Sequence, residues 1–316
     1  MAHALVVLEK YSDWLETYSL FNSKQAFSRI DVCFIENDRN DFKSVEGVFQ
    51  HLLPNHSVSY YSCETRENLF VVAREKCLHL EKGDYFLAPF IRYKNFWKLI
   101  RTSPKGVTKV HLSEVIPDTF GLIGYRMAYR GRNWKSWLTF PLAFLYALTH
   151  KPDVCFFPLY PTLKNPFVRK SGRPIVPSLT TRKKEWFTTL LGGEKRPLII
   201  SGFGYDLELM VRELSITKYI ATSKGKEIII DGQVHPLSER ICAEEVLLSG
   251  LASEIIGYNS AAMLWGKIID PKIKISCYEA EGLNKSYGSL YAKFSRQVLS
   301  KFGINLLPIQ SSMIKK

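Results

Sequence analysis

The pattern of apolar and polar positions predicts strands that alternate with helices through the first part of the chain. Apolar residues at helical spacing in 4–20 predict an opening amphipathic helix. The segment 29–38 is an apolar run of strand-forming residues closed by polar turn residues, which is typical of a buried strand. Further strands are predicted at 57–63, 83–90 and 109–115, and helices at 42–53, 66–80 and 94–101. This alternation indicates βαβ units and a parallel sheet.

A second series of the same kind follows a different middle region. Residues 122–150 are dense in aromatic and basic side chains, 154–161 is a predicted strand, and 162–197 combines proline, glycine and basic residues. We interpret 162–197 as the crossover between two halves. Strands are then predicted at 197–204, 226–232, 252–260 and 272–279, with helices at 206–216, 238–250, 261–269 and 287–302.

The two series predict an α/β chain with two Rossmann-like, parallel-sheet domains that face a central cleft. The expected boundaries are an N-terminal domain at 1–190, a C-terminal domain at 191–290, and a helix and tail at 291–316 that pack back on the first domain. A length of 316 residues is sufficient for two domains of ordinary size.

Composition narrows the class of protein. Hydrophobic residues make up 46% of the chain and charged residues 23%, as in ordinary globular proteins. Lys and Arg number 43 against 30 Asp and Glu, and the net charge of +13 favours anionic partners. The chain has no uninterrupted apolar run of about 18 residues, so no membrane-spanning helix is predicted. Glu9 and Asp13 come too early in the chain for a secretory signal. Six scattered cysteines without a CxxC pair indicate reduced thiols and a cytoplasmic protein.

The strongest candidate for chemistry is His235, which with Pro236 follows the predicted strand 226–232. In open α/β sheets, ligands bind at the carboxyl ends of parallel strands. A histidine that opens the next helix at such an end combines its positive charge with the helix dipole, and both stabilise a leaving phosphate. The alternative is a histidine that caps a turn and binds no ligand.

Two other turns of the second half end a predicted strand at the same edge. In 257–263, Asn259 and Ser260 open a helix, where they act either as ordinary caps or as donors to a phosphate. The segment 200–204 brings glycines to a strand-to-helix turn, which lets a ligand approach the backbone amides. The residues predicted to bind there are Ser201, Gly202 and Gly204. Together, the three turns predict a nucleotide-phosphate site.

In the first half, Glu114 and Asp118 come directly after the predicted strand KVHL. A carboxylate at the carboxyl end of a strand, facing the cleft, is suitably placed to act as a general base. The alternative is a pair of solvated loop acids. The histidines are dispersed and form no HExxH or paired motif, so no metal site is predicted.

The middle region carries an aromatic stripe mixed with basic residues, within 126–148. Such a stripe belongs either to the core or to a peripheral contact with an anionic membrane surface. No RNP, helix-turn-helix or zinc-finger signature is present, so no nucleic-acid partner is expected.

In this order, the motifs resemble those of the bacterial GT-B sialyltransferases, the group of lipooligosaccharide sialyltransferases and capsule polysialyltransferases. That family has an acidic motif in its first domain, then an His-Pro motif and a Ser/Thr motif in its second. The corresponding residues here are 113–118, His235–Pro236 and Asn259–Ser260. The segment 241–248 is similar to the family's helix whose glutamate binds the cytidine ribose, which implies that role for Glu244 or Glu245. The resemblance covers 29–280.

The chain departs from the family pattern in three places, and in one of them the Ser/Thr motif has a single serine, Ser260, instead of two adjacent hydroxyls. Val115 stands where the acidic motif has glycine, and Cys242 stands where the ribose-binding helix has proline. The resemblance therefore leaves open whether Glu114 or Asp118 is the base.

The resemblance implies a GT-B fold and inverting transfer of sialic acid from CMP-sialic acid to a hydroxyl of a lipopolysaccharide, lipooligosaccharide or capsule acceptor. It implies no cofactor and no metal, because a histidine, a serine and helix amides can stabilise the single phosphate of CMP. The acceptor is expected on the cytosolic side of the inner membrane. The alternatives are another GT-B glycosyltransferase that uses CMP-Kdo or a nucleotide-diphosphate sugar, and a non-catalytic basic nucleotide-binding protein.

Overall fold

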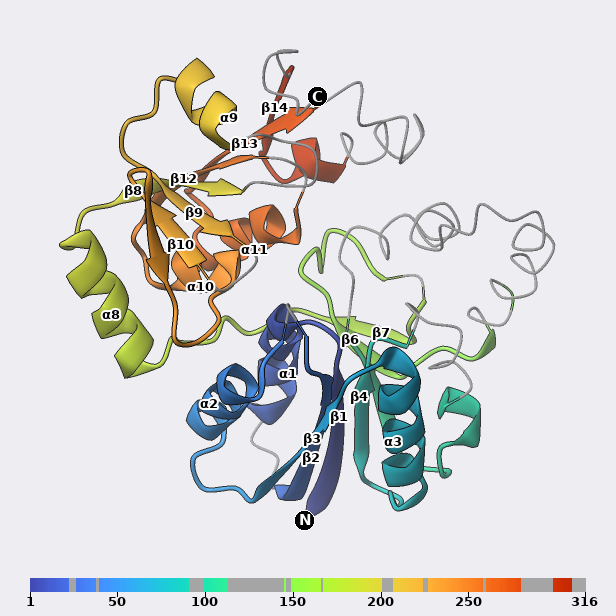
Figure 1. Ribbon diagram of the computed structural model, residues 1–316. Helices are drawn as coiled ribbons and strands as arrows, with labels where there is room; N and C mark the ends of the chain where they lie inside the picture. The colour runs from blue at the N-terminus through green and yellow to red at the C-terminus, as the bar shows by residue number, and fades with distance from the viewer. Residues whose placement is uncertain are drawn as a thin grey trace. The chain divides into compact units, whose positions relative to one another are not determined.

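The chain forms two compact units, Met1–Pro177 and Ser178–Lys316, in a computed structural model (Figure 1). Each unit is built on a mostly parallel sheet of seven strands, which confirms the α/β class. The division falls at 177–178 rather than at 190–191. The structure describes residues 1–22, 27–37, 40–90, 99–112, 145, 149–165, 167–200, 207–223, 227–257, 260–279 and 298–308.

The sheet of the first unit has the strand order β3-β2-β1-β4-β5-β6-β7, and the pairings described in it are all parallel. Its strands are β1 (Ala2–Leu8), β2 (Phe27–Ile35), β3 (Val58–Cys63), β4 (Tyr85–Ala88), β5 (Thr108–His111), β6 (Val154–Phe156) and β7 (Lys170–Gly172). The chain builds outward from β1 to β3, returns to β4 on the other side of β1, and continues outward to β7. The topological switch point of this sheet therefore lies between β1 and β4.

The prediction of an opening helix over 4–20 is wrong in its first half, where β1 forms the central strand. Ala4, Leu5, Val6 and Val7 are fully buried, and β1 pairs with β2 and β4. A strand covered on both faces has a continuous apolar run instead of alternation, and such a run also fits a helix. Helical structure begins only after this strand, at η1 (Tyr11–Asp13) and α1 (Trp14–Phe21).

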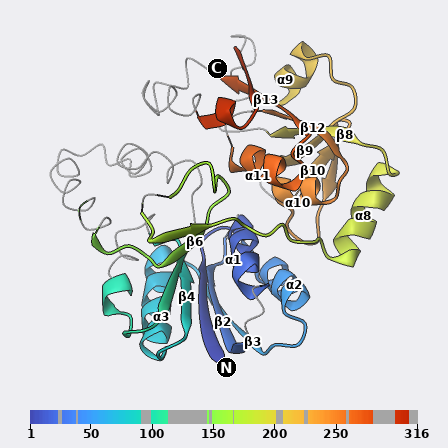
Figure 2. The same ribbon diagram turned by 180° about the vertical axis from the view of Figure 1, so that it is seen from behind.

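The other named helices of the first unit, α2 (Phe42–Leu52) and α3 (Arg66–Leu78), lie where the sequence predicted them, and residues 99–102 are also helical. Asp41 caps α2 by accepting the N–H of Ser44 at 2.9 Å. Thr65 caps α3 by accepting the N–H of Asn68 at 3.2 Å. Figures 1 and 2 show α1 and α2 on one side of the sheet and α3 on the other. The strands are therefore covered on both faces, as a parallel sheet requires.

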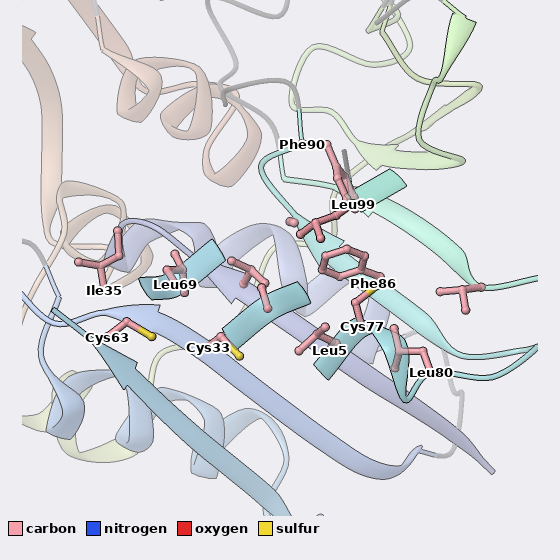
Figure 3. Close-up of a cluster of buried hydrophobic side chains, with 14 of the residues drawn as sticks. Leu5, Cys33, Ile35, Cys63, Leu69, Cys77, Leu80, Phe86, Phe90 and Leu99 are labelled. Atoms are coloured by element: carbon pink, nitrogen blue, oxygen red, sulfur yellow. The ribbon is translucent and has the colours of Figure 1, made fainter. Parts of the chain in front are cut away.

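The core between the sheet and α3 contains three of the six cysteines (Figure 3). Cys33 comes from β2, Cys63 from β3 and Cys77 from α3. The six cysteines of the chain are thiols and form no disulfide. Burial raises the pKa of the Cys77 thiol to about 12 and raises that of Cys33 further. These thiols stay protonated and act as small apolar side chains.

The sheet of the second unit has the order β11-β10-β9-β8-β12-β13-β14. Its strands are β8 (Arg196–Ile200), β9 (Ile220–Ser223), β10 (Glu227–Ile230), β11 (Gln233–Pro236), β12 (Ala252–Gly257), β13 (Lys274–Glu279) and β14 (Asn305–Pro308). The β9–β10 and β10–β11 pairings are antiparallel, and the remaining described pairings are parallel. The sequence pattern missed β9, β11 and β14. Because β14 pairs with β13, the tail residues 305–308 join the sheet of the second unit.

The segment 162–197, interpreted as a crossover, contains both β7 and a regular helix, α8 (Thr181–Leu191). Thr180 caps α8 by accepting the N–H of Lys183 at 3.1 Å, and Gly192 ends it in the left-handed conformation at φ 60°. The other named helices of this unit are α9 (Leu207–Glu213), α10 (Ala243–Leu248) and α11 (Ala261–Ile269).

Candidate functional site

The second sheet reverses its direction of construction between β8 and β12. The chain passes from β8 through α9 to β9 on one side, and from β12 through α11 to β13 on the other. The two strands are adjacent and parallel, with Gly257 opposite Ile200. Ligands of open α/β sheets bind outside the carboxyl ends of the strands that flank such a switch point. The segments that follow Ile200 and Gly257 are therefore the candidate site of this unit.

Gly257 forms the last position of β12 at this switch point. A Cβ atom on it would lie 2.4 Å from the carbonyl oxygen of Ile200. That oxygen belongs to the backbone of a paired strand, so it cannot move aside as a side chain can. Position 257 therefore requires glycine, and the backbones of β8 and β12 approach closely at the edge where a ligand of this fold binds.

Ser260 is the N-cap of α11, and its Oγ accepts the N–H of Ala262 at 3.3 Å. Ser260 therefore caps the helix, which is one of the two roles that the sequence allowed for it. A cap of this kind uses the hydroxyl oxygen as an acceptor, so the hydroxyl proton is the group that Ser260 can donate to a ligand. The first turn of a helix also carries backbone N–H groups without intrahelical partners and a partial positive charge. The beginning of α11 can therefore hold an anion at the carboxyl edge of β12.

Four other residues predicted to bind the donor fall outside the described residues. They are Ser201, Gly202, Gly204 and Asn259. The first three follow β8 in the chain, and Asn259 follows β12. The strands that flank the switch point thus precede two of the three turns that the sequence pattern selected for phosphate binding.

The predicted surroundings of His235 are wrong. The strand before it, β10, runs antiparallel to β9, and His235 lies inside β11, opposite Ile228. A tight turn with Asp231 at φ 52° and Gly232 at φ 86° joins β10 to β11. Two successive left-handed residues are typical of a two-residue hairpin turn, and the pattern instead suggested the end of a parallel strand. His235 therefore does not open a helix.

The register still brings His235 to the edge that carries Ser260. Two antiparallel steps restore the direction of β8 in β11, so Pro236 ends its strand at the carboxyl edge of the sheet. In the sheet order, however, β10, β9 and β8 lie between β11 and β12. Strands are about 4.8 Å apart, so the backbone of His235 is on the order of 19 Å from β12 across the sheet. One phosphate group does not reach both His235 and Ser260 over that span.

The hairpin that carries His235 is fixed at its turn by an arginine from β8. Arg196 Nε lies 3.1 Å from Asp231 Oδ2, and Asp231 Oδ1 accepts the N–H of Tyr219 at 2.8 Å. Asp231 therefore ties the turn to the amino ends of β8 and β9. The position of β11 follows from these bonds as well as from its pairing with β10.

The two glutamates considered for the ribose have different surroundings. Glu245 is 1% exposed, with Oε1 lying 2.7 Å from Lys183 Nζ and Oε2 accepting the N–H of Cys242 at 3.0 Å. Both of its carboxylate oxygens are thus engaged inside the protein, where Glu245 caps α10 and holds Lys183. Because Glu245 is committed to these contacts, the ribose role that the resemblance implies is left to Glu244, which is 7% exposed.

Cys242, which stands in place of the family's proline, is the N-cap of α10. Burial raises the pKa of its thiol well above the usual value, and the carboxylates of Glu245 and Glu244 raise it further. A thiol with a raised pKa stays protonated at neutral pH, and the thiol is a far weaker nucleophile than the thiolate. Cys242 therefore has a structural position at the start of α10 and no nucleophilic character.

The switch point of the first unit is closed by contacts within the chain. Directly after β1, the carboxylate of Asp13 accepts the N–H groups of Glu9 and Lys10, each at 3.0 Å. Asn40 donates Nδ2 to the carbonyl oxygen of Glu9 at 2.7 Å, and Arg66 pairs with the Glu9 carboxylate at 2.7 Å. The sequence pattern did not indicate this cluster, because the apolar run of β1 also fits a helix. The available signal was an acidic residue at the end of an uninterrupted apolar run.

The two candidates for the base, Glu114 and Asp118, lie outside the described residues, as does nearly all of the stripe at 126–148. The preceding strand β5 ends at His111, which is 1% exposed and lies opposite Ala88 of β4 and Cys155 of β6. The chain therefore enters 113–118 from the strand beside β4, one of the two strands at the switch point of the first unit.

Comparison with known protein families gives no match, and no curated protein matches the chain. Within the described residues, no group of three or more His, Cys, Asp or Glu side chains is arranged to hold a metal ion. In that same part of the chain, no helix has the length and apolar character needed to cross a membrane. A functional assignment therefore depends on the residues of the two switch points and on the motif order of the sequence.

Proposed function

We propose that the chain is an inverting, metal-independent sialyltransferase of the GT-B class that uses CMP-sialic acid as its donor. The observation that supports this best is the switch point of the second unit. There, Gly257 allows a close approach of β8 and β12, and Ser260 opens a helix that can hold an anion. The order of the sequence motifs, by its resemblance to the sialyltransferases, supplies the choice of donor.

In this proposal the second unit binds the donor, with different residues serving different parts of it. Ser260 and the start of α11 bind the phosphate, and Glu244 binds the ribose. His235 and Pro236 lie on the outer strand β11, so the donor extends along the carboxyl edge of the sheet from β12 toward β11. His235 then stabilises a group of the donor other than the one that Ser260 contacts.

The first unit, in the same proposal, supplies the base. Glu114 or Asp118 removes the proton of the acceptor hydroxyl while its oxygen attacks the anomeric carbon of sialic acid. The new C–O bond forms as the bond to the phosphate oxygen breaks, and CMP leaves with the electron pair. Because attack and departure occur on opposite faces of the sugar, the configuration inverts.

The acceptor in this proposal is a lipopolysaccharide, lipooligosaccharide or capsule glycan on the cytosolic side of the inner membrane. The net charge of +13 supports a peripheral contact with an anionic surface. No nucleic-acid partner and no cofactor enter the proposed reaction.

The proposal is tested by incubating the purified chain with CMP-sialic acid and a panel of glycan acceptors. We expect acceptor-dependent release of CMP that continues in EDTA. His235→Ala should lower kcat by roughly 10- to 150-fold, the loss expected for one hydrogen bond to a charged group of the donor. His150→Ala, which removes a histidine of the first unit, is the matched control and should retain wild-type activity.

Three outcomes contradict the proposal in different ways. Release of CMP only from CMP-Kdo, or release of a nucleoside diphosphate from another sugar donor, identifies a different glycosyltransferase. Binding of CMP without turnover of any donor identifies a nucleotide-binding protein. A well-folded His235→Ala variant with wild-type kcat removes His235 from the reaction.

A further inference from the structure

Lys183 is a buried lysine in the first turn of α8, close after the boundary between the two units. It is 7% exposed, and its Nζ lies 2.7 Å from Glu245 Oε1 and 3.1 Å from the carbonyl oxygen of Arg240. Its own N–H is held by the N-cap Thr180. A lysine is rarely buried unless it is paired, so its position is specified by the segment that it contacts.

That segment lies between the candidate donor residues of the second unit. Pro236 ends β11, Glu244 lies in α10, and the contacts of Lys183 fall on 240–245. The neighbouring Arg182 adds a contact to the same stretch, with its Nη1 lying 2.9 Å from Glu239 Oε1. Helix α8 therefore holds the connection between His235 and Glu244 at two places.

The pair also fixes the start of α10. Glu245 uses one carboxylate oxygen for Lys183 and the other for the N–H of Cys242, so one side chain joins α8 to the N-cap of α10. Glu244 precedes Glu245 directly on this first turn. A shift of Glu245 therefore moves Glu244 with it.

We propose that Lys183 is a positioning residue of the donor site, which places Glu244 for the nucleotide through its ion pair with Glu245. This inference rests on the proposed function. It predicts that loss of the pair weakens nucleotide binding without loss of the fold, and without any effect on the acceptor.

The test uses the double variant Lys183→Met/Glu245→Gln in the full chain. Glutamine still accepts the N–H of Cys242, and replacing both charges avoids a buried unpaired ion. We expect CMP to bind roughly 2- to 30-fold more weakly by calorimetry, the range for residues that act from outside a site. The KM for donor should rise by a similar factor while the KM for acceptor stays unchanged. The single variant Lys183→Arg keeps the positive charge and should therefore bind CMP more tightly than the double variant, with most of the wild-type affinity.

The matched control is Lys184→Met, which removes the same charge from the next residue of α8, an exposed position. The control should bind CMP as the wild type does. If the control weakens CMP binding as much as the double variant does, loss of positive charge on α8 explains the weaker binding, and the positioning role is overturned. If the double variant does not fold, Lys183→Gln/Glu245→Gln, which keeps a hydrogen bond in place of the ion pair, gives the same comparison.

Failure of the proposed function and failure of the positioning role give different results. Wild-type protein that binds no CMP contradicts the proposed function and this inference with it. Wild-type protein that binds CMP, beside a folded double variant with equal affinity and equal donor KM, overturns the positioning role alone.

Discussion

The two units have the same topological plan and differ in what occupies the switch point. In the first unit, Glu9 at the end of β1 is bonded by three residues of the same unit, Asp13, Asn40 and Arg66. In the second, β8 and β12 end in a glycine-dependent close approach followed by the capped start of α11. Both sheets thus have a switch point at the carboxyl ends of their central strands. In the second unit, the residues at this place are suited to binding an anion.

The units also differ in how their outer strands are held. The first sheet is parallel throughout its described pairings, whereas the second ends in the antiparallel pair β10–β11. Ion pairs from Arg196 and Lys183 fix the turn of that hairpin and the segment after it. We therefore expect substitutions at the switch point of the second unit, or in the buried ion pair of Lys183, to alter nucleotide binding, and substitutions in the first unit to leave it unchanged.

The largest expected effect comes from the single variant Lys183→Met. It leaves the carboxylate of Glu245 buried at 1% exposure without its cation, and removing one partner of a buried pair costs about 3–5 kcal/mol. Urea unfolding resolved by pulsed hydrogen exchange should show this loss in the second unit and no change in β1–β4. An equal loss in both units would show that they unfold together and would contradict the separation of the two.

The sequence pattern was sufficient where a strand or helix had its typical period and typical ends. Helix α3 has an N-cap threonine and helical spacing, and β2 and β3 have compact runs of strand formers, so all three were predicted in place. The failures have a physical cause. Strand β1 is buried on both faces and loses its alternation, and β11 is an exposed edge strand of four residues with little apolar pattern.

The residues of the candidate site could also be predicted only in part from the sequence. Ser260 could be assigned to a helix start because serine after a strand is a typical N-cap. The exclusion of Glu245 from an open site could not be predicted, because its partner Lys183 is 62 residues away in sequence and lies in a segment interpreted as a crossover. The local pattern also predicted that His235 follows a parallel strand and opens a helix, whereas it lies in a strand. The direction of β10 could not be predicted, because it is set by pairing with β9 and not by composition.

The next largest effect is expected for Gly257→Ala, at the switch point of the second unit. The added methyl group would meet the carbonyl oxygen of Ile200 at 2.4 Å, and overpacking of this kind costs about 1–3 kcal/mol. We expect lower stability of the second unit and weaker CMP binding by calorimetry.

Gly266→Ala in α11 is the matched control for this substitution. Its added methyl group also has a close neighbour at 2.4 Å, but that neighbour is Cδ1 at the movable end of the Ile255 side chain. The control should therefore cost less stability and leave CMP affinity near wild type. Equal losses in both variants would contradict the special role given to position 257.

A pH-dependent effect is expected in the first unit, at Asp31. Burial raises the pKa of this carboxyl group, but hydrogen bonds and charges from His3 and Arg29 outweigh burial and lower the pKa overall. Its stabilisation is therefore present above the unfolded-state pKa of about 3.9 and is lost as the pH falls through the lower folded value. Asp31→Asn should reduce stability by about 1–3 kcal/mol at pH 7, the cost of leaving hydrogen-bond partners unsatisfied.

The measurement for Asp31 is urea unfolding of wild type and variant at pH 7 and pH 3. The gap between them should narrow at the lower pH, because the unfolded wild type then binds a proton at Asp31 and the variant has no such group. CMP affinity at pH 7 should be the same in both proteins. A gap that is constant with pH would mean that the charge of Asp31 contributes nothing, and a change in CMP affinity would break the contrast between the units.

The smallest effect is expected for Arg182→Ala, the residue next to Lys183 on α8. Its ion pair with Glu239 has a distance of 2.9 Å, close to that of Lys183 with Glu245, but the side chain of Arg182 is 74% exposed. Exposed pairs contribute less than about 1 kcal/mol, because water and salt screen the charges and the long side chain loses freedom. We therefore expect a small loss of stability that disappears at high salt, measured by urea unfolding at low and high ionic strength. Since both pairs link α8 to the segment after β11, a loss as large as that of Lys183→Met would mean that the linkage itself, and not burial of the charge, makes Lys183 important.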